Sequence, residues 1–217
     1  MMFELPLFPL NTVLFPGMPI ALHIFEERYI EMIGACLSSR QPFGIVLIQR
    51  GQEALGPLAD TYPVGCSAEI IDSVKLEQGR MNINAMGKER FRIMSIKQDE
   101  PYLVGKVATF PLQSADDPKL VGKGKALRPW IDRYLDILSN AGEFEIDSQL
   151  LPEEPIALAF LGAILLQMPQ RMKQQLLEIK TANNLLLELR HDYRREVALL
   201  AAMLDRPRAE EGPFTTN

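Results

Sequence analysis

The character of the amino-acid sequence changes near residue 113. Before this point, short apolar runs are separated by glycine and proline, whereas beyond it apolar residues recur at the three- and four-residue spacing of amphipathic helices. A series of strands followed by a series of helices is typical of an α+β fold. We therefore predict an α+β chain with a β-rich subdomain over residues 1–112, a helical subdomain over 113–205 and a mobile tail over 206–217.

The β-rich part contains short apolar runs bounded by turn residues. About six strands are expected, and they fall near residues 5–10, 20–25, 43–48, 64–76, 81–96 (with a break at Gly87) and 102–110. An amphipathic helix is expected over residues 26–38, and a polar loop over 51–62. Sequential antiparallel strands of this kind close into a sheet or a small barrel more readily than they build a parallel sheet.

The second part predicts helices near residues 119–140, 153–167, 169–179 and 181–204. Pro129 lies inside the first of them, so it should kink that helix or begin a new one. The last helix carries leucines on one side and charged residues on the other, which is typical of a long helix that buries a single stripe.

Composition limits the possible classes of protein. The net charge is −5, which disfavours a broad nucleic-acid surface. The two cysteines, Cys36 and Cys66, form no CxxC pair, so neither a disulfide framework nor a zinc site is expected. The N-terminal residues lack the basic segment of a signal peptide, and no apolar run approaches the ~20 residues of a membrane-spanning helix. We expect a cytoplasmic protein that does not contact membranes.

Motifs for catalysis are missing. The segment 121–126 resembles a phosphate-binding loop but lacks the upstream glycine and the hydroxyl residue, and the segment 65–69 fails the last position of GxSxG. The two histidines, His23 and His191, lie in different halves. We interpret His23 as a hydrogen-bonded strand residue rather than a catalytic base. The chain is therefore expected to be no enzyme and to need no cofactor or metal.

A mildly basic cluster lies in and around the strand expected over 81–96. Its members are Arg80, Lys88, Arg90, Arg92 and Lys97. They could contact RNA phosphates, but no aromatic stacking pattern accompanies them. The favoured interpretation is a solvated face of the sheet.

A series of short motifs in the first half resembles a known family. In chain order they are Glu4–Leu10, Val13–Pro19, Leu22–Glu26, Arg28–Tyr29, Phe43–Ile48, Val64–Ala68 and Gly87–Phe91. In this order and spacing they resemble the N-terminal substrate-binding domain of ATP-dependent Lon proteases, which also occurs in stand-alone proteins and in the substrate receptor cereblon. The resemblance continues less specifically through Lys173–Glu178.

The resemblance implies a PUA-like pseudo-barrel followed by a helical bundle. It implies recognition of unfolded or damaged polypeptide, or assembly of a larger machine. The matching region is not the catalytic one, so no catalytic residue carries over, and we expect a stand-alone form without the ATPase and protease domains. The motif residues are predicted to encode the fold; they include His23, Glu26, Arg28, Tyr29, Gly87, Glu89, Arg90 and Phe91.

The turn around Gly17 offers the best candidate for a polypeptide-binding surface. The predicted surface consists of Phe15, Pro16, Met18 and Pro19. A groove where the barrel meets the helices is the second candidate place. Methionine suits promiscuous contact because its thioether is flexible. The alternative is that Phe15 and Met18 are core residues that close the end of the barrel.

Three functions from different classes follow. The leading hypothesis is a non-catalytic module that binds unfolded or peptide-like polypeptide, as an adaptor in protein quality control and in partnership with a protease or chaperone machine. RNA binding is the alternative, since PUA-like folds also host it. A hydrolase is the least favoured, because its motifs are absent.

Overall fold

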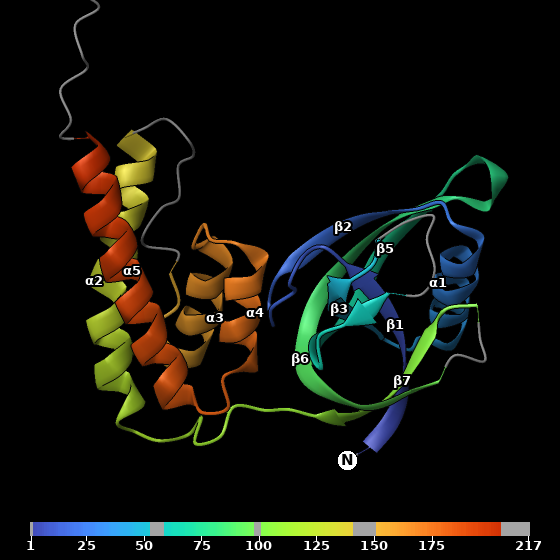
Figure 1. The fold of residues 1–217 in the computed structure, drawn as a ribbon, viewed down its shortest axis with the longest axis horizontal. Coiled ribbons are helices and arrows are strands. Elements are labelled where there is room, and N and C mark those ends of the chain that lie inside the picture. The colour runs from blue at the N-terminus through green and yellow to red at the C-terminus, as the bar shows by residue number, and fades with distance from the viewer. Residues whose placement is uncertain (1, 53–58, 98–100, 141–150, 205–217) are drawn as a thin grey trace, which may run out of the picture.

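The computed structural model describes residues 2–52, 59–97, 101–140 and 151–204. It has two halves, a β-barrel with one helix and a group of four helices, which lie side by side in Figure 1. This arrangement confirms the predicted α+β class. The predicted tail over residues 206–217 lies outside the described residues.

The barrel half follows the predicted strands closely. Its elements are β1 (Met2–Leu10), β2 (Pro19–Ile24), α1 (Glu27–Ser39), β3 (Phe43–Arg50), β4 (Asp60–Thr61), β5 (Val64–Lys75) and β6 (Met81–Lys97), then β7 (Leu103–Thr109). A short 3-10 turn, η1 (Glu77–Gly79), joins β5 to β6. The structure corrects two of the predictions made from the sequence. The loop over 51–62 contains the short strand β4, and β6 runs through Gly87 without interruption.

The strands pair in a closed circuit. β1 pairs with β7, β7 with β6, β6 with β5 and β5 with β3, all antiparallel. The circuit closes through β1 and β3, which are parallel, with Leu7 opposite Gly44. The circuit is thus mostly antiparallel, as the sequence favoured, and at this parallel pair α1 lies in the crossover that parallel neighbours need. β2 lies outside the circuit and pairs with the first part of β6.

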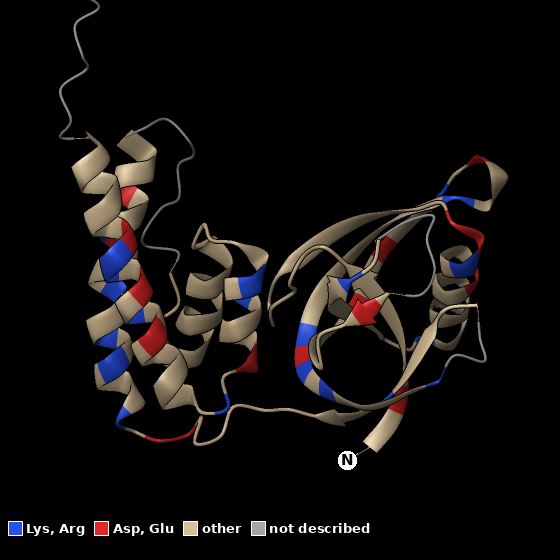
Figure 2. Ribbon diagram, viewed as in Figure 1, with Lys and Arg blue, Asp and Glu red and all other residues tan. Residues whose placement is uncertain are grey.

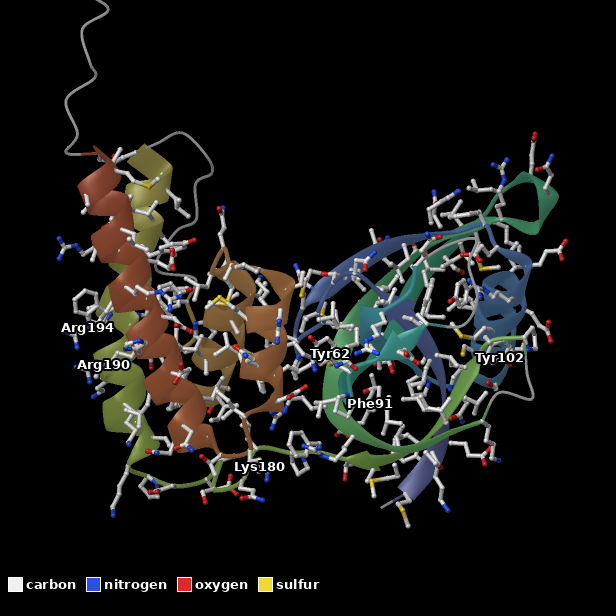
Figure 3. The ribbon with its side chains drawn as sticks, viewed as in Figure 1. Tyr62, Phe91, Tyr102, Lys180, Arg190 and Arg194 are labelled. Atoms are coloured by element: carbon white, nitrogen blue, oxygen red, sulfur yellow. The ribbon has the colours of Figure 1, made fainter. Side chains whose placement is uncertain are left out.

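Two apolar clusters fill the barrel half. One lies inside the circuit and includes Leu7, Phe91 and Val107, all at most 1% exposed. Figure 3 shows the Phe91 ring pointing into this interior. The other cluster lies under α1, where Met32 and Ile33 pack against the sheet. This burial is what holds the single amphipathic helix against the strands.

The helical half consists of α2 (Leu120–Asn140), α3 (Pro155–Leu165), α4 (Gln170–Glu178) and α5 (Ala182–Leu204). α2 and α5 are parallel neighbours in Figure 1, and the rings of Tyr134 and Tyr193 meet edge to face at 5.2 Å between centroids. The Tyr193 hydroxyl donates to the Gly162 carbonyl at 2.8 Å, which ties α3 to α5. α2 continues through Pro129, so this proline does not begin a new helix.

Packing crosses the change from strands to helices. Val13, Phe15, Leu47 and Val64 of the barrel half share one hydrophobic cluster with the helices. The Gln174 side chain donates to the Val64 carbonyl at 2.9 Å. Tyr62 lies on the barrel wall nearest α4 in Figure 3 and packs against the same cluster. The two halves therefore meet through a continuous core.

The connector between β7 and α2 is held in place as well. The Gln113 amide donates to the Lys180 carbonyl at 2.9 Å, and the Gln113 carbonyl accepts from the Ala182 amide at 3.0 Å. Lys180 lies between α4 and α5, beside this connector, in Figure 3. Two segments distant in sequence thus form a short parallel bridge at the base of the helices.

Candidate functional site

The turn between β1 and β2 is fixed by glycine. Gly17 has a φ of 79°, which favours glycine, and its amide donates to the Gly87 carbonyl at 2.9 Å. The Gly87 amide returns a bond of 2.9 Å to the Met18 carbonyl. A Cβ at Gly87 would lie 2.1 Å from the Phe15 carbonyl oxygen. The two glycines therefore allow the turn to lie directly on β6.

The structure separates the four residues of the predicted binding surface. Phe15 is 0% exposed and belongs to the cluster shared by the two halves. Its ring is a core element that closes the barrel end, which was the alternative, so it has no surface to offer a partner. Pro16 and Met18 are half-buried, and Pro19 is exposed. Met18 packs against both large clusters, so it also contributes to the core.

A groove runs between the turn and α3, where the barrel meets the helices. It consists of two cavities of about 400 Å³ and 380 Å³ that share Pro16 and Phe160, and we call it the interdomain groove. The first cavity extends to β6 and the connector. The second continues over Gly17, Leu161 and Ile164. The sequence predicted a groove at this place but named none of its helical residues.

α3 supplies the apolar floor of the interdomain groove. Its residues are apolar on all sides: Leu158, Ala159, Gly162 and Ala163 are buried against the bundle, while Ile156, Phe160, Leu161 and Ile164 face the groove and are half-buried. The carboxylate of Glu154 caps the helix by accepting from the Ile156 amide at 2.9 Å. A short helix without a polar face was the sequence signal for this surface, because such a helix must be covered on more than one side.

Arg90 occupies the barrel wall of the groove and corrects the prediction of a solvated basic face. It is 3% exposed, and its Nη1 donates to the carbonyls of Leu177 at 2.6 Å and Ile179 at 2.7 Å. These carbonyls end α4, where the helix dipole favours a cation. Burial lowers the pKa of Arg90 to about 10, so the guanidinium stays charged at neutral pH. Its bonds to these two carbonyls place it where β6 meets α4, not on a solvated face of the sheet.

Other basic residues lie beside Arg90. The guanidinium groups of Arg90 and Arg92 lie 4.8 Å and 4.5 Å from the centroid of the Phe110 ring. Lys88 pairs with Glu69 at 2.7 Å, with both side chains more than half exposed. Figure 2 shows this run of basic residues, interrupted by one acidic residue, on the bend of β6 that faces the helices.

The remaining motif residues lie at two separate places. His23 contacts Asn82 at 2.7 Å between Nδ1 and Oδ1, as expected of a strand histidine. At the start of α1, Arg28 pairs with Glu26 at 2.8 Å and lies over the buried ring of Tyr29. The amide of Glu89 donates to the Ser67 hydroxyl at 3.1 Å. The interdomain groove is lined by Glu89 and Arg90, while His23, Glu26 and Tyr29 line another hollow near β2.

Within the described ranges, histidine, cysteine and acidic side chains form no group of three or more that could bind a metal ion. None of the helices in the described part of the chain has the length and apolar composition needed to cross a bilayer.

The face of α5 away from the barrel carries Arg190 and Arg194, as Figure 3 shows. The Arg194 guanidinium lies 5.4 Å from the centroid of the Trp130 ring.

Comparison with known proteins agrees with this architecture. The Lon protease of Anaeromyxobacter dehalogenans is 27% identical over 206 residues, which cover 93% of this chain and 24% of that protein. Lon protease 2 of Myxococcus xanthus is also 27% identical over 206 residues and is covered to 25%. The chain thus spans about a quarter of the length of these curated relatives.

Solved structures share the fold. A Lon N-terminal domain protein from Xanthomonas campestris superposes with a TM-score of 0.64 at 24% identity, covering 86% of this chain and 96% of that one. The N-terminal domain of the Mycobacterium avium complex Lon protease gives 0.65 at 19% identity, with 88% and 98% covered. The family model of the ATP-dependent protease La (LON) substrate-binding domain matches residues 4–190. The chain therefore belongs to the LON substrate-binding domain family.

Proposed function

We propose that this chain is a non-catalytic module that binds unfolded or damaged polypeptide in the interdomain groove. The observation that carries the proposal is the apolar face of α3, with Phe160 and Ile164 at its centre, left half-buried opposite the turn at Pro16. Unfolded chains display apolar side chains that folded proteins bury, and a groove of this lining recovers their burial energy of about 25 cal/mol per Å².

The barrel wall of the groove is tied to the helical half by hydrogen bonds. Arg90 bonds the end of α4, and the Val13 amide donates to the Gln170 side chain of α4 at 2.9 Å. A site whose walls are already in place loses little conformational entropy on binding. We infer a role as an adaptor that presents polypeptide to a protease or chaperone machine.

The test uses a labelled apolar peptide and fluorescence anisotropy with the full chain. Replacing Phe160 by Ala should weaken binding by at least about tenfold, because aromatic groove residues contribute most of the energy of such sites. Leu187→Ala is the matched control, since Leu187 is 46% exposed on α5 and does not line the groove. Equal affinities of the wild type and Phe160→Ala, with both folded, would exclude the groove as the binding surface.

The absence of catalysis is tested separately. Purified protein is incubated with ATP or with casein, and phosphate release and peptide products are measured. No turnover is expected, because the matched region of the relatives is their substrate-binding domain. Turnover abolished by a single substitution in this chain would contradict the proposal. A pull-down from cytosol, repeated after addition of ATP, would identify the partner machine.

A further inference from the structure

One end of the interdomain groove carries two cations, of which only Lys88 has an ion-pair partner among the described residues. Lys88 and Arg90 both line the first cavity. Arg90 forms no ion pair with a described residue, and its Nη1 donates to two neutral carbonyls. Its Nη2 is buried and lacks a hydrogen-bond partner among the residues that the structure describes. Buried donors in native proteins are nearly always satisfied, so this one indicates a missing acceptor.

The acidic residues nearby leave this charge in excess. Glu89 lines the same cavity, and Glu69 pairs with Lys88 from outside it. The Lys88–Glu69 pair is exposed, and exposed pairs are weak enough for Lys88 to change partners. The cavity is therefore lined by two cations, the buried Arg90 and the exposed Lys88, and by one carboxylate, that of Glu89.

The shape of the cavity limits what can reach these cations. The connector residues Phe110, Pro111 and Leu112 form the wall of this cavity, whereas beyond Pro16 and Phe160 the groove continues as the second, apolar cavity. A polypeptide that lies over α3 and extends into the first cavity therefore runs toward the covalent connection between the two halves. A chain that ends at this point needs no path past the connector.

We propose that the interdomain groove takes the C-terminal end of a polypeptide, with apolar side chains over Phe160 and the terminal carboxylate at Lys88 and Arg90. This inference rests on the proposed function and adds the chemistry of the ligand. A carboxylate supplies the acceptor that Arg90 lacks, and hydrogen bonds between ionised partners are about twice as strong as neutral ones. The apolar side chains fill the rest of the groove.

The experiment compares three peptides of the same apolar sequence, labelled at the N-terminus, by anisotropy with the full chain. One ends in a free carboxylate, one in an amide, and one in an amide with an internal aspartate. The free acid should bind about tenfold more tightly than the amide, which corresponds to one charge-assisted contact. The internal aspartate should not restore this difference.

Paired variants locate the effect at the cavity. Lys88→Gln should reduce the advantage of the free acid to less than about threefold, because it removes one of the two cations. Glu69→Gln breaks the same ion pair but keeps the Lys88 charge, so it should preserve or increase the advantage. Arg90→Lys, checked by its melting temperature, should retain only part of the advantage, because an ammonium lacks the guanidinium fork.

The outcomes separate this inference from the function on which it rests. Equal binding of the acid and the amide overturns the inference and leaves polypeptide binding intact. Equal binding of the free acid and the aspartate peptide also overturns it, because the site would then read acidic side chains. If none of the three peptides binds, the proposed function and the inference fail together.

Discussion

The Arg90 Nη1 atom and the Leu177 carbonyl oxygen are 2.6 Å apart, and this contact joins the barrel wall to the end of α4. The residues are separated by 87 positions in the chain. Because the guanidinium also bonds Ile179, one side chain satisfies two carbonyls that the helix leaves free. The contact holds Arg90, which lines the interdomain groove, against the end of α4.

Replacing Arg90 by Ala should lower the free energy of unfolding by roughly 3 kcal/mol, because both carbonyls lose their donor and a cavity replaces the side chain. Chemical denaturation with urea measures this loss. Arg92→Ala is the control, because Arg92 is half-buried, contacts the same Phe110 ring and donates to neither carbonyl; its cost should stay below about 1 kcal/mol. Similar costs for both would show that the α4 contact is unimportant.

Adding a single methyl group at two glycines should have opposite effects. Gly87→Ala places its Cβ 2.1 Å from the Phe15 carbonyl, so the turn must move and stability should fall by roughly 1–3 kcal/mol. Gly122→Ala adds a Cβ to α2 where nothing lies within 4 Å, and it should raise stability by about 0.5–1 kcal/mol. The melting temperatures of both variants, compared with that of the wild type, test this prediction. A neutral Gly87→Ala would mean that the turn does not need its close contact with β6.

The protein should lose stability on the alkaline side. Burial raises the pKa of the Cys66 thiol to about 12 and of the Cys36 thiol to about 11, from an ordinary value of 9.0. Burial, with a smaller effect of Tyr134, raises the pKa of Tyr193 well above 10.0. These groups hold their protons more tightly when folded. Their contribution to the free energy of unfolding is therefore fully present below about pH 9 and is lost as the pH rises toward 11 and 12.

Urea midpoints at pH 7, 9 and 10.5 measure this decline. The Tyr193→Phe variant lacks the ionising phenol and should show a shallower decline, although it should lose about 1 kcal/mol at pH 7 with the bond to the Gly162 carbonyl. A flat profile for the wild type up to pH 10.5 would contradict the assigned burial of these groups.

A cut in the connector should leave the halves together. Residues 114–118 are exposed and polar, which favours cleavage there in limited proteolysis. The cluster that Phe15 and Val64 share with the helices should nevertheless hold the two fragments in one complex on gel filtration. Fragments that elute separately would show that the shared core is too weak to join them.

Much of the fold could be predicted from local patterns, since each strand and helix depends on nearby residues. The parallel pairing of Leu7 with Gly44 could not, because it depends on how α1 crosses the sheet. The burial of Arg90 was missed for a related reason. Alternation along a strand shows which side chains share a face, but not that α4 covers that face. Phe160 lies in an apolar run that predicted only a helix. The groove that it lines forms only because the fold places the turn at Pro16 opposite α3, and local patterns do not show this.

The closure of the barrel also affects how the chain folds during synthesis. β1 pairs with β7 through Met2 and Ala108, so one edge of the first strand waits for a partner more than a hundred residues later. At ordinary rates of translation this wait lasts roughly 5–20 s. β3 reaches the other edge of β1 sooner, through the pair of Leu7 and Gly44. A nascent chain that stalls before β7 is complete exposes an unpaired edge of β1, and such edges pair readily with other chains.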